Sequence, residues 1–492
     1  MSQLIVAVVI VATFVLLALE KAHRVLIVIG AVAVLWLFTY LTPWQLITFE
    51  QAHAAVDLNV IFLLAGMMAI VAVLKSTGVF SWAVERVMTA AAGRPGRVMV
   101  LVASFTALLS AFADNVTTVV FVTPMALAMA KELGVRPVAF LLPMVMAANI
   151  GGTATLIGDP PNIMIGSAAG IPFLDFILAL AAPCFLMMIW MEWLSARWYR
   201  DVVHAPARAL SVRAEPISNR PLLRWGLVIT GLVFAGFFAH GFTGMPAAVP
   251  ALIGAAALLV VQDVLYIRSH RPSQAERVHG ILDVIEREIE WPTLAFFAFL
   301  FIAVGAAVAT GLVGTIAQGL AWTIARGEAM LALDSRGTIL LAALLILWTS
   351  GMLSAVIDNI PFVAVAIPVV AQLTPELGVE GNVLWWALSL GACLGGNASP
   401  VGASANVTVV GIAERAGIHI GFREFLRYGG TVTAGTLLIA SLWLVSYIYL
   451  GPMRTLWIGL LVGALLLGTR LMVGGARNQS PTLHPEPPAA NR

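Results

Sequence analysis

Two glycine-rich stretches decide the fold of this chain: GGTATLIGDPPN at residues 151–162 and GGNASPVGASAN at residues 395–406. They are 244 residues apart. Sliding the chain along itself by that distance aligns residues 110–162 with residues 354–406 without a gap, and 16 of the 53 positions are identical. The identities fall on polar and turn-forming residues, including the pairs Asp114/Asp358 and Asn115/Asn359. This self-similarity predicts an internal structural repeat.

The composition places the chain in a membrane. It is 60% hydrophobic and 11% charged, whereas soluble domains usually carry about a quarter of their residues as charged ones. The net charge is only +2 and the basic residues are spread over short loops, so the sequence predicts no basic patch that could bind nucleic acid. The two cysteines, Cys184 and Cys393, both lie in apolar stretches, so they exclude a disulfide framework and a cysteine-rich metal site. The sequence predicts no metal site.

Apolar stretches predict the membrane-spanning helices. About 20 apolar residues cross the hydrocarbon core. Two further stretches, 98–130 and 337–373, carry Ala-Asp-Asn or Ile-Asp-Asn in the middle and are predicted to be re-entrant hairpins, which enter and leave on the same side. The eleven predicted spans are 3–19, 25–42, 58–75, 137–159, 172–194, 222–240, 245–262, 293–313, 383–411, 427–449 and 454–473.

These elements predict an all-α polytopic membrane protein with two inverted repeats, about eleven transmembrane helices, two re-entrant hairpins and two broken helices. Five membrane crossings separate the third span from its repeat partner, the eighth, and an odd number makes the repeats antiparallel. The predicted organisation is a first repeat over 1–197 (hairpin 98–130, broken helix 137–162), a cytoplasmic linker over 198–221, a second repeat over 222–449 (cytoplasmic loop 263–290, hairpin 337–373, broken helix 383–411), an extra transmembrane helix over 450–475 and a disordered cytoplasmic tail over 476–492.

The basic residues predict the orientation. If the N-terminus lies outside, all but three of the 27 Lys and Arg residues fall on the cytoplasmic side, the exceptions being Arg326, Arg336 and Arg454. Counting either hairpin as a full span would blur this bias. We therefore expect a multi-pass protein of a bacterial-type inner membrane, with its N-terminus outside and its C-terminus in the cytoplasm.

The candidate binding site combines the two hairpin tips, 110–118 and 354–361, with the two glycine-rich breaks. Freed carbonyls and half-helix ends at such breaks can bind ions or polar solutes near the bilayer midplane. The backbone candidates are Gly151, Gly152, Gly158, Gly395, Gly396 and Gly402. The side-chain candidates for substrate or ion binding are Ser110, Asp114, Asn115, Thr117, Thr153, Thr155, Asp159, Asn162, Ser354, Asp358, Asn359, Asn397, Ser399, Ser404 and Asn406.

Three carboxylates lie in these stretches: Asp114, Asp159 and Asp358. An acid at bilayer depth costs about 2.5 to 3.5 kcal/mol on insertion scales, so each needs a partner or a role. One interpretation is that each acid caps a half-helix through backbone N–H groups. The recurrence of Asp114 and Asp358 at equivalent repeat positions favours a function, and all three are candidates for proton coupling.

At these motifs the chain resembles the ion transporter superfamily. It is most similar to the branch of arsenite permeases, NhaD-type sodium/proton antiporters and the P permease, and the resemblance covers most of residues 50–448. Sodium-coupled dicarboxylate relatives carry Ser-Asn-Thr at the hairpin tips. Here the tips read Asp-Asn-Val at 114–116 and Asp-Asn-Ile at 358–360. By resemblance, this departure implies proton-coupled antiport instead of sodium/dicarboxylate symport.

Three transport functions stay open. Three acids and no Lys or Arg in the predicted site disfavour a multiply charged anion, because like charges repel strongly in a low dielectric. We rank export of arsenite or antimonite in exchange for protons first, since neutral As(OH)3 can donate hydrogen bonds to Asp, Asn, Ser and Thr. Sodium/proton antiport comes second, and sodium- or proton-coupled dicarboxylate or citrate transport third.

Other classes fit less well. A channel would need a continuous polar pore, and a hydrolase would need a nucleophile–base pair, so we expect no enzyme. The expected partners are membrane lipid and a small inorganic substrate, with H+ or Na+ as coupling ion, no other cofactor and no nucleic acid. The resemblance also admits a soluble ATPase partner, as in arsenite efflux systems, and a homodimer.

Overall fold

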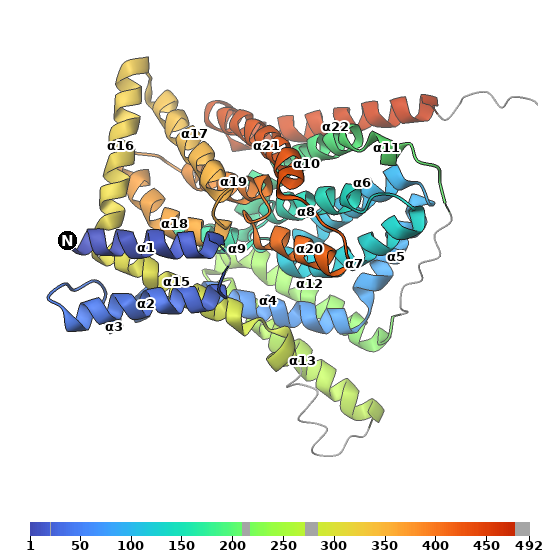
Figure 1. Cartoon of the computed structure of the whole chain (residues 1–492), viewed down its shortest axis with the longest axis horizontal. Coiled ribbons are helices and arrows are strands. Elements are labelled where there is room, and N and C mark those ends of the chain that lie inside the picture. The colour runs from blue at the N-terminus through green and yellow to red at the C-terminus, as the bar shows by residue number, and fades with distance from the viewer. Residues whose placement is uncertain (20, 209–216, 271–283, 478–492) are drawn as a thin grey trace, which may run out of the picture.

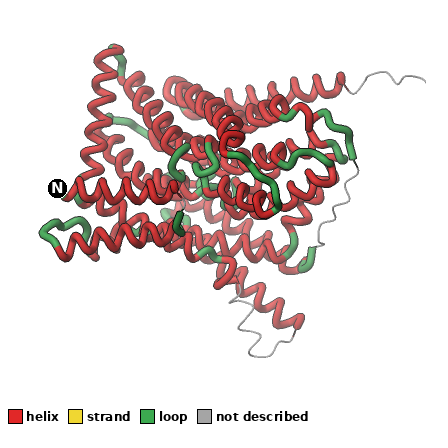
Figure 2. Tube along the Cα trace, viewed as in Figure 1, coloured by secondary structure: helices red, strands yellow, loops and turns green. Residues whose placement is uncertain are grey.

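The computed structural model describes residues 1–19, 21–208, 217–270 and 284–477. Within this part of the chain the regular elements are all helical and no strand occurs (Figure 2). Eleven of its helices are long and apolar enough to cross a bilayer. The predicted fold class, an all-α polytopic membrane protein, is confirmed.

The helices follow in the order shown in Figure 1. The N-terminal elements are α1 (Ser2–Leu19), α2 (Arg24–Leu41) and α3 (Phe49–Ala55), and the middle elements are α12 (Arg220–Thr243), α13 (Ala248–His270) and the short π-helix η1 (Val284–Glu288). The first repeat contains α4 (Leu58–Ser76), α5 (Val79–Ala91), α6 (Pro95–Ser110), α7 (Asn115–Leu133), α8 (Val138–Thr153), α9 (Pro160–Ala169), α10 (Phe173–Trp198) and α11 (Arg200–Val203). The second contains α15 (Trp291–Ala309), α16 (Leu312–Leu331), α17 (Ser335–Ser354), α18 (Asn359–Glu376), α19 (Val383–Gly395), η2 (Gly396–Ala398), α20 (Ser404–Arg415) and α21 (Phe422–Leu450), before α22 (Pro452–Arg477).

The backbone repeats its unusual conformations at equivalent points. Helices α5 and α16 both begin after a left-handed glycine, Gly78 with φ 79° and Gly311 with φ 76°, a conformation that glycine adopts without steric cost. Both helices end at a left-handed alanine, Ala92 with φ 50° and Ala332 with φ 47°. The residues just before α7 and α18 are Asp114 and Asp358.

Helix α16 was missed from the sequence, which placed a single span over 293–313. Helix α15 ends at Ala309, the chain turns at Gly311, and α16 follows over 20 residues. The charged and amide residues Gln318, Arg326 and Glu328 interrupt the apolar run of α16, so no apolar stretch long enough for a span is recognisable there. The predicted span 293–313 is therefore not one helix: a turn at Gly311 separates α15 from α16.

The helices of the two repeats pack against one another crosswise. The arm α6 lies along α8, and its counterpart α17 lies along α19. Between repeats, α7 contacts α20 and α18 contacts α9, so each hairpin touches the broken helix of the other repeat. This exchange brings both tips and both breaks to one place.

Three of the four hairpin arms are longer than expected for a tip at the midplane. The arms α7, α17 and α18 each have the length of a full span, whereas the fourth arm, α6, is shorter, as are α8, the segment Val383–Ala398 and the apolar part of α22 over Pro452–Leu466. At 1.5 Å per residue, 18 to 20 residues reach about 27 to 30 Å, close to the thickness of the hydrocarbon core. A tip at mid-membrane therefore requires tilted arms, and the re-entrant path stays a prediction.

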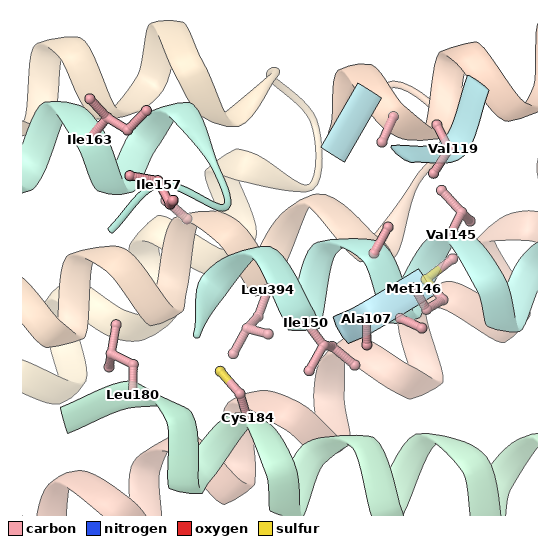
Figure 3. Close-up of a cluster of buried hydrophobic side chains, with 14 of the residues drawn as sticks. Ala107, Val119, Val145, Met146, Ile150, Ile157, Ile163, Leu180, Cys184 and Leu394 are labelled. Atoms are coloured by element: carbon pink, nitrogen blue, oxygen red, sulfur yellow. The ribbon is translucent and has the colours of Figure 1, made fainter. Parts of the chain in front are cut away.

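A large apolar cluster surrounds the crossing point of the repeats. Figure 3 shows Cys184 of α10 next to Ile150 of α8 and Leu394 of α19, with Leu180 one turn along the same helix. Cys184 is 2% exposed, and its neighbours here are hydrocarbon. This thiol is part of the apolar packing.

Two predicted loops lie partly outside the described residues. Helix α13 continues to His270, so the first residues of the predicted loop 263–290 are helical, while 271–283 fall outside. Within the linker 198–221, the short helix α11 and the start of α12 are described and 209–216 are not. The predicted tail 476–492 begins inside α22 and otherwise lies outside.

The orientation can be tested with topology reporters. A reporter inserted in the segment 198–221, or fused to the C-terminus, is expected to report the cytoplasm. One inserted between Gly241 and Met245, at the end of α12, is expected to report the periplasm, because one span separates the two sites. A periplasmic signal from the middle segment would contradict the inverted-repeat scheme.

Candidate functional site

The tips and breaks enclose a small polar cavity, here called the inner pocket, of about 30 Å³. Its walls come from both repeats, including α4 and α15, and from α2. Of the predicted site residues, Asp114, Asn115, Asp159, Asn359 and Ser404 line it. The remaining lining residues are Arg24, Leu64, Met68, Val116, Asn149, Pro160, Glu290, Thr293, Ile360, Ala403 and Ala405.

The first tip is organised by its acid and its amide. Asp114 caps α7, since its Oδ2 accepts from the Thr117 backbone N–H at 2.8 Å and from Thr117 Oγ1 at 2.9 Å. Next to it, the buried Asn115 accepts a hydrogen bond from Ser110 Oγ and donates to Asn149 at 3.4 Å. The capping interpretation therefore describes the local role of Asp114.

The second tip uses its acid in two ways. Asp358 Oδ1 accepts from the Ile360 backbone N–H at 3.0 Å, which caps α18. Its Oδ2 accepts from Ser404 Oγ of the second break at 2.7 Å. Asp358 thus joins the hairpin to the broken helix of its own repeat.

Asp159 has a different environment, although it too stands at the start of a helix. Asp159 does not cap α9. Its carboxylate accepts no hydrogen bond from the backbone of α9, because Pro160 and Pro161 occupy the first two helical positions and have no backbone N–H. Its side chain is 3% exposed and its Oδ2 accepts from Asn359 Nδ2 at 3.2 Å, across the two repeats. The double proline therefore leaves this acid available to a ligand or a proton.

Two equivalent asparagines, Asn162 and Asn406, each bind backbone carbonyls of their own break. Asn162 Nδ2 donates to the carbonyls of Thr153 at 3.1 Å and Thr155 at 2.9 Å. Its repeat partner Asn406 donates in the same way to Gly396 and Ser399, each at 2.8 Å. These amides satisfy carbonyls that the broken helices leave without a helical partner.

Asn149 of α8 joins the first repeat to the second break and was absent from the sequence prediction. It donates to Asn397 Oδ1 at 2.8 Å and to Asn406 Oδ1 at 3.0 Å, both in the other repeat. Its equivalent in α19 is Cys393, whose Sγ lies 3.6 Å from Asn162 Oδ1. Ser389, also in α19, donates to the same oxygen at 2.6 Å.

Several predicted hydroxyls are satisfied by backbone. Thr153 donates to Asn149 O at 2.7 Å, and Ser354 donates to Ala392 O at 2.6 Å. Thr155 donates to Ala111 O and accepts from the Gly158 N–H. The counterparts of Thr153 and Thr155 in the second repeat are Asn397 and Ser399. Their buried atoms Asn397 Nδ2 and Ser399 Oγ have no hydrogen-bond partner among the described residues.

The glycines of the breaks allow backbone segments to approach one another closely. A Cβ at Gly158 would lie 2.6 Å from Gly152 O and 2.7 Å from Ser110 O. A Cβ at Gly402 would lie 2.7 Å from Gly396 O and 2.7 Å from Ser354 O. Real Cβ atoms essentially never approach so closely, so the breaks require glycine for close approach.

The expectation that no Lys or Arg reaches the site is wrong. Arg24, the first residue of α2, lines the inner pocket. Its Nη1 donates to Ser404 Oγ at 3.1 Å and its Nη2 donates to Thr293 Oγ1 at 2.8 Å. Glu290 also lines the pocket and accepts from Thr293 Oγ1 at 2.9 Å. No local pattern in the sequence marked Arg24 or Glu290 as part of the site.

A wider cavity of about 500 Å³, here called the vestibule, adjoins the inner pocket. It opens between the α1–α2 turn and α20, and Asp358 lies in its wall. Three basic residues line it: His23, Arg24 and Arg415. Among the residues that the structure describes, no group of three or more His, Cys, Asp or Glu side chains could hold a metal ion.

Comparison with known proteins gives consistent matches. A family model described as CitMHS, citrate transporter, matches residues 14–391. An uncharacterized transporter of Mycobacterium tuberculosis is 39% identical over 453 residues, covering 89% of this chain and 98% of the relative. The P protein of Mus musculus is 30% identical over 518 residues, covering 89% of this chain and 59% of the relative.

The fold is also similar to a solved structure. The YdaH transporter of Alcanivorax borkumensis, described as having an unusual topology, superposes with a TM-score of 0.57 and 18% sequence identity. The match covers 92% of this chain and 98% of that one. The likeness concerns the fold.

Proposed function

Since this chain belongs to the CitMHS citrate transporter family, within the ion transporter superfamily, it is a multi-pass membrane transporter, and we propose that it works as a proton-coupled antiporter. Its carried solute is a small neutral or cationic inorganic species. Arsenite or antimonite is our first candidate and sodium our second. The binding roles of the tip and break residues are part of this proposal.

The observation that carries the proposal is the set of carboxylates around the inner pocket. Asp114, Asp159 and Glu290 line it, and Asp358 reaches it through Ser404. Asp159 is the acid that its own helix does not cap. A buried acid without a cap can bind a proton in one step and a solute in the next, which is the exchange that antiport needs.

The acceptor chemistry suits neutral arsenite. As(OH)3 offers three O–H donors, and carboxylate and amide oxygens of Asp159 and Asn115 line the pocket as acceptors. The inner pocket alone has room for only about one or two water molecules. A solute of several atoms therefore requires the inner pocket and the vestibule to join, whereas a bare sodium ion does not.

Citrate or another carboxylate is a third candidate, and a specific observation favours it. Arg24 lies at the inner pocket, and His23 and Arg415 line the vestibule, so cationic groups face the approach. Guanidinium groups bind carboxylates well. The name of the matching family, citrate transporter, points the same way.

Flux in proteoliposomes separates the three candidates. Purified protein is reconstituted, an outward or inward pH gradient is imposed, and uptake of arsenite, sodium and citrate is measured in parallel. We expect arsenite flux that follows the pH gradient in direction and collapses with a protonophore. Flux of sodium without arsenite would support the second candidate, and flux of citrate alone would refute a neutral or cationic solute. Coupling to H+ or Na+, a soluble ATPase partner and a homodimer stay predictions.

A further inference from the structure

The inner pocket and the vestibule share a boundary of three residues. Arg24, Val116 and Ser404 line both cavities. Val116 is apolar and follows the first tip, whereas Arg24 and Ser404 form a hydrogen bond with each other across the boundary. Whatever passes from one cavity to the other must pass these side chains.

Arg24 is held in this boundary by three contacts. Its guanidinium donates to Ser404 Oγ and to Thr293 Oγ1, and its carbon Cζ lies 5.5 Å from the centre of the Phe296 ring. Phe296 belongs to α15, as does Thr293, while Ser404 belongs to α20. Arg24 therefore ties α2 to two helices of the second repeat.

Both hydroxyls that accept from Arg24 donate their own hydrogen to a carboxylate. Ser404 donates to Asp358 at 2.7 Å, and Thr293 donates to Glu290 at 2.9 Å. Each hydroxyl thus stands between a guanidinium and an acid. Hydrogen bonds to charged groups are about twice as strong as neutral ones, so the arrangement stabilises the closed boundary. Loss of negative charge on either acid weakens it.

The other half of the molecule has the same framework without a cation. There α13 lies against α4, as α2 lies against α15. Asn59 of α4 donates to Ser167 of α9 at 3.0 Å and accepts from the backbone N–H of Ala248 at 3.0 Å, where α13 begins. At that junction the contact between α13 and α4 is made by a backbone amide and not by a guanidinium.

We propose that Arg24 is a gate between the vestibule and the inner pocket, a tethered cation that must leave Ser404 and Thr293 before a solute can pass. The gate rests on the proposed function in one respect, that the inner pocket is where the solute binds. It guards the route through the vestibule, and its release depends on the charge of Asp358 and Glu290. Protonation of Asp358, which lines the vestibule, would therefore weaken the hold on Arg24 from that side.

Cysteine labelling tests the gate without any solute. In a background with Cys184→Ser and Cys393→Ser, a single cysteine replaces Met68, which lines the inner pocket and not the vestibule. A second protein carries its cysteine at Val407, which lines the vestibule and not the inner pocket. The rate of modification by a small cationic methanethiosulfonate is measured in detergent, with and without Arg24→Ala.

We expect Arg24→Ala to speed labelling at position 68 by roughly tenfold or more, because two charge-assisted hydrogen bonds are lost. Labelling at position 407 should stay within about twofold, since the vestibule is already open. Thr293→Val, which removes one of the two acceptors and keeps the charge, should give a smaller rise at position 68 alone.

Two results would overturn the gate. One is unchanged labelling at position 68 in both Arg24→Ala and Thr293→Val. The other is an equal rise at positions 68 and 407, which would indicate general loosening of the helices. Because the labelling needs no solute, its result holds whichever solute the flux assay identifies.

Discussion

Replacement of Asp159 by asparagine is expected to reduce pH-gradient-driven flux to the level of protein-free vesicles while the protein still folds. The amide keeps the shape of the side chain and can hydrogen-bond with Asn359, but it cannot take up and release a proton. No backbone cap is lost, because Pro160 and Pro161 leave Asp159 without one. Flux in proteoliposomes and the elution profile on size exclusion measure the two outcomes.

The tip acids provide an internal comparison. Asparagine caps helices about as well as aspartate, so Asp114→Asn and Asp358→Asn should preserve α7 and α18. Any loss of coupled flux in these variants then reports the loss of a titrating group. We expect both to impair coupling, with Asp159→Asn the most severe.

Asp57→Asn is the matched control. Asp57 caps α4 by accepting from the backbone N–H groups of Asn59 and Val60, and it does not line the inner pocket. Its replacement should leave coupled flux intact. Normal pH-driven flux in the Asp159 variant, or an equal loss in the Asp57 variant, would remove Asp159 from the coupling mechanism.

Replacement of Gly151 by alanine is expected to prevent stable folding. The added Cβ would overlap the backbone carbonyl of Ala107, where α8 lies against α6. The backbone on both sides cannot move aside as a flexible side chain can. Ordinary overpacking destabilises a protein by about 1 to 3 kcal/mol, so we expect the free energy of unfolding to fall by roughly 3 kcal/mol or more. Thermal unfolding in detergent, followed by fluorescence-detected size exclusion, measures the loss.

Two further glycine variants make this prediction specific. Gly395→Ala should behave like Gly151→Ala, because its Cβ would meet the Gly351 backbone where α19 lies against α17. Gly231→Ala, in the middle of α12, meets no atom within 4 Å and should leave the melting temperature unchanged or raise it. A Gly151 variant that melts with the wild-type protein would show that α6 and α8 can separate without loss of the fold.

The sequence by itself determined the class of the protein, the repeat and the positions of the helix breaks. These features are local, since the prolines after Asp159 and the Asp-Asn pairs fix backbone conformation or capping wherever they occur. Ten of the sixteen residues that line the inner pocket lie in the tips and breaks marked by this local chemistry, and five of them were named as site residues. The sequence prediction overlooked α16 because that helix carries charged residues that hide its span signal.

Only the tertiary structure decided which of these residues meet and with what charge. Arg24 reaches Ser404 across 380 positions of sequence, and Asn149 reaches Asn406 across 257, so no local pattern could reveal either contact. The structure also places Asn359 of the other repeat 3.2 Å from Asp159, a contact that the prolines after Asp159 do not reveal. The physical reason is that capping depends on one turn of backbone, whereas the charge balance of a buried pocket depends on how α2, α15 and both repeats pack together.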